Sequence, residues 1–329
     1  MKKFINQPQD VEKEMLSGMA KAYPRYVKLL DEADVVVRAV KKEGKVALIS
    51  GGGSGHEPAH GGYVGSGMLD AAVAGPVFTS PAADRIFEGI KAVATDAGVL
   101  MIVKNYTGDV MNFEMAGEMA EMEGITVKQV ITNDDVAVKD STWTVGRRGV
   151  AGTVFVHKIA GAKAEQGASL DEVQAVAQKV IDNVRTMGAA IAPCTVPAAG
   201  KPGFTLTEEE MEVGIGIHGE PGTHKEAVRP VNETVDMLLE QILADLDYSG
   251  SEVAVLINGA GGTPVMELYI INNHVADVLA AKGIKVYRTL VGNYMTSIEM
   301  QGFSVSLLKL DDEMKALLDA PAETIAWKE

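Results

Sequence analysis

Two histidines in the sequence are flanked by glycines, and each follows a short apolar segment. His56 comes after the run GGGSG at residues 51–55, and His218 is followed by GEPG at residues 219–222. The pKa of an imidazole lies close to 7, so histidine suits a neutral nucleophile or a general base. Because the two segments belong to different α/β units, we predict a single site built between them.

The glycine-rich loop before His56 has the composition of a ligand-binding turn. Gly53, Ser54 and Gly55 have small side chains or none, which lets a ligand approach the backbone N–H groups. The loop lacks the Gly-Lys-Ser/Thr ending of a P-loop. On the pattern alone, a generic tight turn of an α/β protein has about one chance in three. His56 favours ligand binding, because a residue at the carboxyl end of such a strand is placed to touch a ligand.

A second polar segment, KNYTGD, follows the apolar run at residues 99–103. Lys104 is a candidate donor to a hydroxyl or carbonyl oxygen of a ligand, and Asp109 is a candidate acceptor. For Asp109, the N-cap of the following helix is an equally weighted alternative, because aspartate is common at that position. The two roles of Asp109 are compatible with each other.

The remaining histidines and the cysteine have no expected chemistry. We expect packed or solvent-facing positions for the other four histidines: His60, His157, His224 and His274. No two histidines have the spacing of a metal motif such as HExxH. Cys194 is the only cysteine, which excludes an intrachain disulfide and a cysteine cluster. We therefore predict no metal bound by protein side chains.

Two further glycine-containing segments have more than one interpretation. Residues 149–153 (GVAGT) fit either a packed helix entry, favoured about two to one, or a phosphate-facing turn. Residues 259–263 (GAGGT) fit either a ligand loop or tight packing between a strand and a helix. Neither segment is assigned to the site.

Composition indicates a globular, cytoplasmic protein. The 329 residues favour two domains, and 47% hydrophobic residues are enough for a packed core. A net charge of −15 disfavours nucleic acid and anionic lipid as partners. No apolar run approaches the roughly 18 residues of a membrane helix. The N-terminal residues lack the apolar core of a signal peptide, so we expect a cytoplasmic location.

Helical and strand patterns alternate along the chain, which predicts an α/β fold with two α/β domains and largely parallel sheets. We expect a first domain at residues 1–187 and a second at 188–329, with the substrate site between glycine-rich loops at the carboxyl ends of strands. The expected strands span residues 45–50, 68–74, 99–103, 125–131, 190–195, 211–217, 253–258 and 284–291.

Helices are expected between these strands. Two helices are expected within residues 8–42, and single helices at 110–123, 230–246 and 264–282. Another helix begins with Ser80 as its N-cap and Pro81 at its first position. A further helix begins at a capping box of Ser169 and Glu172 and runs to residue 187. Whether a C-terminal helix at 311–318 packs back on the first domain is left open.

Four long segments of the chain resemble the K subunit family of dihydroxyacetone kinases. They are LISGGGSGHEPAHGGYVGSGMLDAAVAGPVFTSP, VKNYTGDVMNFEMA, GRRGVAGTVFVHKIAGA and GIGIHGEPG, and the similarity extends along essentially the whole chain. The resemblance implies two α/β domains, a homodimer, and dihydroxyacetone bound as a hemiaminal on a histidine that maps to His218. It maps the family's substrate-binding residues to Gly53, Ser54, Gly55, His56, Lys104 and Asp109.

The resemblance also implies a partner and a reaction. In one arrangement of the family, a nucleotide-binding L domain follows K on the same chain and uses ATP. In the other, a separate L subunit holds ADP with Mg²⁺, and a phosphocarrier of the sugar phosphotransferase system rephosphorylates that ADP. Because the sequence ends at Glu329, we expect the second arrangement, with no cofactor on this chain. The implied activity is that of a phosphoenolpyruvate–glycerone phosphotransferase, with His56 as general base and Asp109 orienting the hydroxyl or sharing that role.

Two other functions compete with this expectation. Some members of the family bind dihydroxyacetone and act as co-activators of a transcription regulator. The presence of both His56 and Asp109 favours the catalytic subunit. A Rossmann-like oxidoreductase is the third candidate, but no acidic ribose-binding residue follows the glycine loop convincingly.

Overall fold

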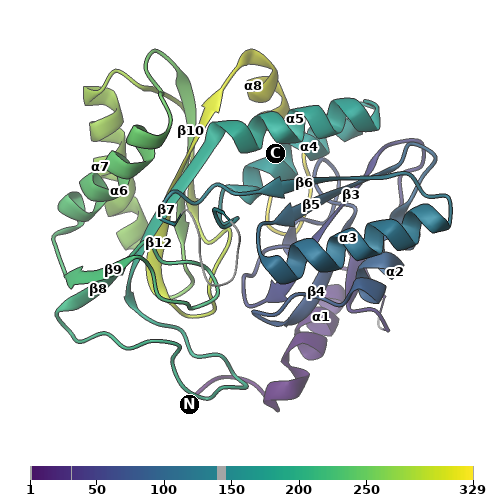
Figure 1. Cartoon of the computed structure of the whole chain (residues 1–329), viewed down its shortest axis with the longest axis horizontal. Helices are drawn as coiled ribbons and strands as arrows, with labels where there is room; N and C mark the ends of the chain where they lie inside the picture. Colours follow the sequence, from purple (N-terminus) through teal and green to yellow (C-terminus); the bar gives the residue numbers. More distant parts are fainter. Residues whose placement is uncertain (1, 31, 139–145, 329) are drawn as a thin grey trace.

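The computed structural model describes residues 2–30, 32–138 and 146–328 and contains two six-stranded sheets (Figure 1). The first sheet has the spatial order β1 (Val27–Leu30), β2 (Val35–Arg38), β4 (Ala71–Val77), β3 (Ala47–Ser54), β5 (Val99–Lys104) and β6 (Val127–Thr132). The second has the order β11 (Lys285–Gly292), β10 (Glu252–Gly259), β12 (Gln301–Leu310), β7 (Val184–Ala192), β8 (Glu210–Val213) and β9 (His224–Ala227).

Helices cover both sheets and also lie between them. They are α1 (Val11–Ala22), α2 (Ala83–Val93), α3 (Thr107–Met122), α4 (Thr153–Glu165), α5 (Leu170–Asn183), α6 (Val231–Asp245), α7 (Val265–Ala281) and α8 (Asp312–Leu318), with 3₁₀ turns at Pro8–Asp10 and Gly61–Tyr63. No helix of the described chain is long and apolar enough to cross a membrane.

The first sheet confirms the predicted α/β pattern in its central strands. Strands β4, β3, β5 and β6 are parallel to one another, with α2 and α3 among the connections, whereas β2 is antiparallel to β4. The prediction of two helices within residues 8–42 is wrong, because α1 is followed by the antiparallel pair β1 and β2. The run of β-branched residues at 35–37 favours a strand over a helix there.

The second sheet corrects the prediction of largely parallel sheets. Among its described strands, only β10 and β11 pair in parallel, joined by α7. Strand β12 lies between β10 and β7 and is antiparallel to both, and β7, β8 and β9 are antiparallel in turn. An apolar run indicates a buried strand but does not encode its direction. No strand is predicted at residues 301–310, where β12 lies.

Some element boundaries also differ from the predictions. Strand β8 ends at Val213, so His218 lies within a loop rather than directly after a strand. Helix α2 begins at Ala83 with Ala82 at its N-cap, two residues after the predicted cap Ser80. The predicted capping box is present at the start of α5. That helix ends at Asn183, because the chain continues directly into β7.

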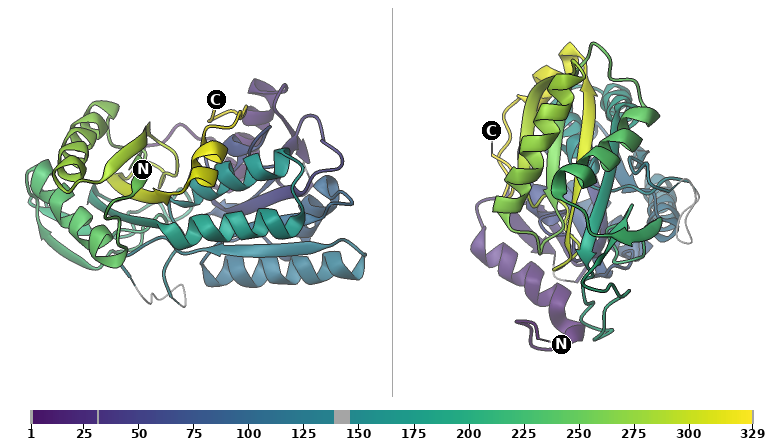
Figure 2. Two further views of the ribbon diagram at one scale, coloured as in Figure 1. Left: turned by 90° about the horizontal axis from the view of Figure 1, so that it is seen from above. Right: turned by 90° about the vertical axis from the view of Figure 1, so that its left-hand side faces the viewer.

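The region between the two sheets is filled by α4, α5 and α8 (Figures 1 and 2). Side chains of β10 alternate between two clusters, as expected for a strand buried on both faces. Ala254 and Leu256 join the cluster of α4, α5 and α8, whereas Val253 and Val255 join that of α6 and α7. Both sheets therefore share one apolar cluster, and the division of the chain at residue 187 stays a prediction.

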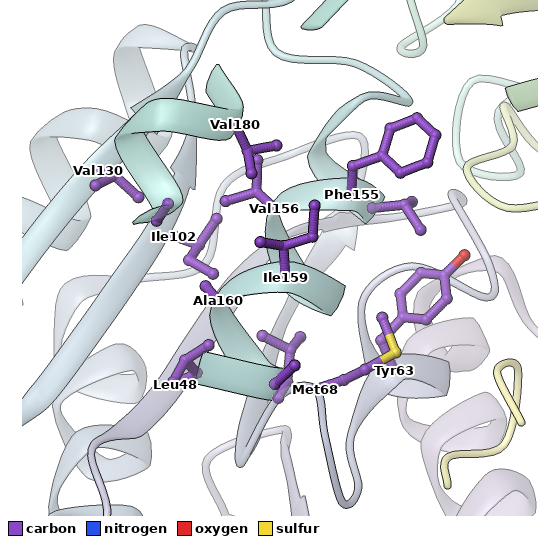
Figure 3. Close-up of a cluster of buried hydrophobic side chains, with 14 of the residues drawn as sticks. Leu48, Tyr63, Met68, Ile102, Val130, Phe155, Val156, Ile159, Ala160 and Val180 are labelled. Atoms are coloured by element: carbon purple, nitrogen blue, oxygen red, sulfur yellow. The ribbon is translucent and has the colours of Figure 1, made fainter. Parts of the chain in front are cut away.

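Helix α4 forms the centre of this shared cluster (Figure 3). It is buried along nearly its whole length, which suits a helix with apolar residues on all sides. The packed side chains come from α4, from β3, β5 and β6, and from α5: Phe155, Val156, Ile159, Ala160, Leu48, Ile102, Val130 and Val180. Lys158 is also buried on α4, and its Nζ donates to the carbonyl oxygen of Leu317 at the end of α8 (2.7 Å).

The last described segment returns to the first sheet. Helix α8 packs on α4, within the predicted first domain. Beyond it, the backbone N–H of Glu323 donates to Ser66 (2.9 Å) and that of Ala326 to Gly62 (2.9 Å). Trp327 is 4% exposed and belongs to the shared cluster. Residues from the two ends of the chain thus complete one core.

Truncation of Leu256 tests this shared core. The Leu256→Ala substitution removes a fully buried side chain, and we expect it to lower the free energy of unfolding by about 2–5 kcal/mol. Urea denaturation followed by circular dichroism measures this loss. The control Ile270→Ala, at a side chain that is 48% exposed on α7, should change the free energy by less than about 0.5 kcal/mol. Equal effects of both variants would contradict the shared core.

Candidate active site

Three loops bring aromatic rings around His218. Its ring centroid lies 4.8 Å from that of His56, at an interplanar angle of 76°. Tyr106, at the N-cap of α3, lies perpendicular to it at 4.3 Å. Phe78, directly after β4, lies edge-on to it at 5.6 Å and stacks on His56 at 5.2 Å. The structure therefore brings the two predicted histidines together in a cage that restricts the orientation of the His218 ring.

The hydrogen bonds of His56 determine which ring nitrogen is free. Its Nδ1 lies 2.8 Å from the carbonyl oxygen of Thr296. A carbonyl can only accept, so Nδ1 carries the proton and Nε2 keeps its lone pair. Nε2 is buried and has no hydrogen-bond partner among the described residues. Since a buried polar atom without a partner is unusual, this nitrogen is available to accept a proton from a ligand.

Desolvation keeps both imidazoles neutral, His56 being fully buried and His218 partly buried. Desolvation, followed by the charge of Lys104, lowers the pKa of His56 to about 3. Desolvation is also the main reason that the pKa of His218 is well below its usual range, and His56, Lys104 and Arg148 lower it further. A neutral imidazole has the lone pair that nucleophilic attack or proton abstraction requires. Both histidines are therefore neutral at pH 7.

Lys104 is wholly buried and directed toward protein groups. Its Nζ donates to the carbonyl oxygen of Gly51 (3.2 Å) and to Nε2 of His60 (3.0 Å), and lies 3.7 Å from Oδ2 of Asp109. Burial lowers the pKa of Lys104, whereas Asp109 raises it. An ammonium group has three donors, so the predicted contact with a ligand oxygen requires one of them to change its partner.

Asp109 lies in the first turn of α3 but is not its N-cap. Tyr106 occupies the N-cap position, so the alternative prediction that Asp109 caps this helix is wrong. Burial raises the pKa of Asp109, whereas Lys104 and then Ser80 lower it. Its Oδ1 is buried and has no partner within the described ranges. Asp109 thus presents a second free acceptor, held near the positive end of the α3 dipole.

Sequence reasoning missed several residues of this site. The hydroxyl of Tyr106 is a third buried polar atom without a hydrogen-bond partner in the described part of the chain. Tyr106 lies inside the KNYTGD segment, which was the available signal. Nothing in the sequence distinguishes Phe78 from any other residue that follows a strand. Thr296 acts on His56 through its backbone carbonyl, for which residue type gives no signal.

The glycine loop is held by protein contacts. A Cβ on Gly53 would lie 2.5 Å from the backbone nitrogen of Thr79, so only glycine permits this approach. The hydroxyl of Ser54 donates to the carbonyl oxygen of Gly75 (2.8 Å). The N–H of Gly55 donates to Oε1 of Glu57 (3.1 Å). The predicted substrate contacts of these three loop residues therefore stay predictions.

His60 and His157, for which only packing is predicted, extend the hydrogen-bond network behind Lys104. Since the ammonium of Lys104 can only donate, Nε2 of His60 must accept, and the proton of His60 lies on Nδ1. That Nδ1 lies 3.0 Å from Nε2 of His157. His60 and His157 are both buried, as expected for packed residues, and they also fix the direction of Lys104. Of the other two, His224 is exposed and His274 contacts Asp236 (2.8 Å).

Backbone contacts account for the two remaining glycine segments. The N–H groups of Val150 and Gly152 donate to the carboxylate of Asp134 (both 2.8 Å), which favours packing over phosphate binding at 149–153. The N–H groups of Ala260 and Gly262 donate to carbonyl oxygens near β12. Within the described ranges, no group of three or more His, Cys, Asp or Glu side chains could hold a metal ion.

Known proteins resemble this chain along its whole length. The family described as "Dak1 domain" matches residues 17–326. A Listeria innocua protein named "PTS-dependent dihydroxyacetone kinase 1, dihydroxyacetone-binding subunit DhaK" is 54% identical over 329 residues, 99% of this chain and 100% of the relative. Among solved structures, "Dihydroxyacetone kinase operon co-activator Dha-DhaQ" has a TM-score of 0.92 at 39% identity, over 96% of this chain and 98% of that one.

A longer relative also shares the fold. The dihydroxyacetone kinase of C. freundii, in its native form, has a TM-score of 0.92 at 36% identity. The match covers 99% of this chain and 60% of the longer one.

The buried histidines predict a loss of stability in acid. His157 has its pKa lowered to about 3 by burial and then by Lys104, so it stays neutral in the folded protein at pH 5. In the unfolded chain the imidazole takes up a proton below about pH 6.5, which favours unfolding by about 1.4 kcal/mol per pH unit. The drop in unfolding free energy from pH 7 to pH 5 should therefore be about 2 kcal/mol smaller in His157→Gln than in the wild type.

Urea denaturation at the two pH values measures this difference. Some groups change the unfolding free energy in the opposite direction as the pH falls, such as Asp135, whose pKa burial raises to about 6. Their contributions are present in both proteins and cancel in the comparison. His224→Gln, at an exposed site, is the matched control and should follow the wild type. An equal pH dependence in wild type and His157→Gln would contradict the neutral state of the buried ring.

Proposed function

The chain belongs to the Dak1 domain family, and we propose that it is the dihydroxyacetone-binding subunit of a dihydroxyacetone kinase that depends on the phosphoenolpyruvate phosphotransferase system. The observation that carries this proposal is the 54% identity, over the full length of both chains, with a Listeria innocua protein of that description. The resemblance of the four sequence segments to the K subunit family is thereby confirmed.

Covalent attachment of dihydroxyacetone to His218 is the central chemical step of the proposal. A neutral ring nitrogen adds to the carbonyl carbon, the C=O π bond breaks, and the oxygen becomes a hydroxyl by taking up a proton. The ring releases the proton of its other nitrogen, so the adduct is neutral. The bonded nitrogen has no hydrogen left to lose, so the adduct stops at a hemiaminal. The low pKa of His218 supports this role, because it keeps the nucleophile unprotonated.

Phosphoryl transfer requires a group to accept the proton of the attacking hydroxyl. The free Nε2 of His56, close to the His218 ring, supports its role as general base. The free Oδ1 of Asp109 supports a role in orienting the hydroxyl or sharing the base function. Attachment to His218 fixes the substrate relative to both groups, and this positioning contributes most in a loose transition state.

The phosphoryl donor is expected on a second protein. In this proposal a separate L subunit carries ADP with Mg²⁺, a phosphocarrier of the sugar phosphotransferase system recharges it, and this chain binds no nucleotide. A homodimer is part of the same proposal. The product is dihydroxyacetone phosphate.

A co-activator function is the second candidate. The solved co-activator Dha-DhaQ shares the fold with a TM-score of 0.92, which favours a related ligand site. Its 39% identity is lower than the 54% identity with the kinase subunit. The presence of His56 and Asp109, each with a free acceptor atom, also supports the kinase subunit over the co-activator.

Intact-protein mass spectrometry under native conditions tests the covalent step. We expect dihydroxyacetone, in buffer without borohydride, to add the mass of one dihydroxyacetone to the wild type and nothing to His218→Ala. Glycerol should add nothing to either protein, because it has no carbonyl group. An adduct of equal yield on His218→Ala would show that another residue is the nucleophile.

Substitution of His56 separates binding from phosphoryl transfer. In His56→Gln the adduct on His218 should still form, whereas the rate of dihydroxyacetone phosphate formation with the L subunit and phosphocarrier should fall by about 10²–10⁴-fold. His224→Gln is the matched control with an expected wild-type rate. A His56→Gln rate within about threefold of the wild type would exclude His56 as the base, and no turnover by the wild type would favour the co-activator.

A further inference from the structure

His218 lies in a loop, so the hydrogen bonds of a β-sheet do not fix its backbone. The loop spans residues 214–223 between β8 and β9. The backbone N–H of His218 donates to a side chain of the same loop, Oε2 of Glu220 (2.8 Å). This bond fixes the backbone of His218 only if the carboxylate of Glu220 is itself fixed.

Arg148 provides that attachment from the segment before α4. It is 1% exposed, and its Nη1 lies 3.2 Å from Oε1 of Glu220. Its Nη2 donates to the carbonyl oxygen of Gly214 (2.7 Å). One planar guanidinium therefore binds the loop on both sides of His218, four residues before it and two residues after it. A lysine has a single nitrogen and cannot reproduce this geometry.

Asp135 fixes the arginine in turn. Its Oδ2 lies 2.7 Å from Nε and 2.6 Å from Nη2 of Arg148. The three charged groups are almost completely buried, with side-chain exposures of 1% for Arg148, 3% for Asp135 and 10% for Glu220. Removing one partner of a buried ion pair leaves an uncompensated charge, so the arrangement is held as a unit.

The loop is shaped around this pair of side chains. A Cβ on Gly216 would lie 1.8 Å from Oε1 of Glu220 and 2.7 Å from Nη1 of Arg148. Only glycine lets the backbone pass at this distance. The segment IGIHGE thus wraps closely around the contact between Glu220 and Arg148.

We propose that Arg148 is a positioning residue for the covalent histidine, acting through Glu220 and Gly214 to aim the His218 ring at the substrate carbonyl. This inference rests on the proposed hemiaminal function. Arg148 also adds to the effect of burial that lowers the pKa of His218. Its role lies in formation of the adduct, because His56 and Asp109 are the groups expected to face the attacking hydroxyl afterwards.

The chain offers a matched control in the adjacent arginine. Arg147 forms a partly buried ion pair with Asp245, and no hydrogen bond or ion pair among the described residues joins it to the loop of His218. Arg148→Lys and Arg147→Lys therefore make the same chemical change at neighbouring positions. Glu220→Gln is a third variant, which retains an acceptor for the N–H of His218 and loses the charge that pairs with Arg148.

Titration with dihydroxyacetone, read by native mass spectrometry, gives the apparent Kd of the adduct for each protein. Loss of the contact between Arg148 and Glu220 lets the His218 ring leave its attack orientation, and the apparent Kd rises as the fraction of correctly oriented rings falls. We therefore expect the Kd of Arg148→Lys and of Glu220→Gln to rise by about 10- to 100-fold. The Kd of Arg147→Lys should equal that of the wild type. At saturating dihydroxyacetone, kcat with the L subunit should stay within about threefold of the wild type for all three variants.

Each outcome separates this inference from the proposed function. If the wild type forms no adduct, the proposed function fails and the inference fails with it. If the wild type forms it and Arg148→Lys and Glu220→Gln bind equally well, only the inference is overturned. An equal rise in Kd for Arg147→Lys would also overturn it, because the effect would then reflect general destabilisation. If Arg148→Lys does not fold, Glu220→Gln decides the question.

Discussion

The hydrogen bond between Nδ1 of His56 and the carbonyl oxygen of Thr296 (2.8 Å) joins the two halves of the site. It belongs to a set of bonds between the loop after β3 and the segment that precedes β12. The N–H of Thr296 donates to the carbonyl oxygen of His56 (3.2 Å), and that of Ile298 donates to Gly55 (2.8 Å). The position and the tautomer of His56 therefore both depend on contact between the first and the second sheet.

The electrostatics of the site follow from the same close packing. Burial removes the charge of the histidines, whereas the two buried cations next to them are retained because each has carboxylate partners. Lys104 faces Asp109, and Arg148 faces Asp135 and Glu220. Buried charges require such partners. Nε2 of the neutral His56 ring is then left with a free lone pair at pH 7.

The sequence predicted the parts of the fold that local patterns encode. The parallel strands of the first sheet follow from apolar runs between helices, and the glycine-flanked histidines indicated the two loops that meet. The direction of β12 and the course of the 214–223 loop could not be predicted, because both depend on tertiary contacts. His218 is positioned by Arg148, which lies 70 residues earlier in the chain, and no local pattern reveals such a contact.

The return of the C-terminal segment to the first sheet has a consequence for how the protein forms during synthesis. The core around α4 includes Leu308, Leu317 and Trp327, which join a cluster most of whose other members lie before residue 185. A nascent chain that already contains β3, β5 and α4 still exposes the apolar surface that α8 and Trp327 cover. Such a chain exposes apolar surface until residues 312–327 have been synthesised and have packed on α4. Completion of the shared core therefore waits for residues 312–327, although the strands of the first sheet all lie within residues 27–132.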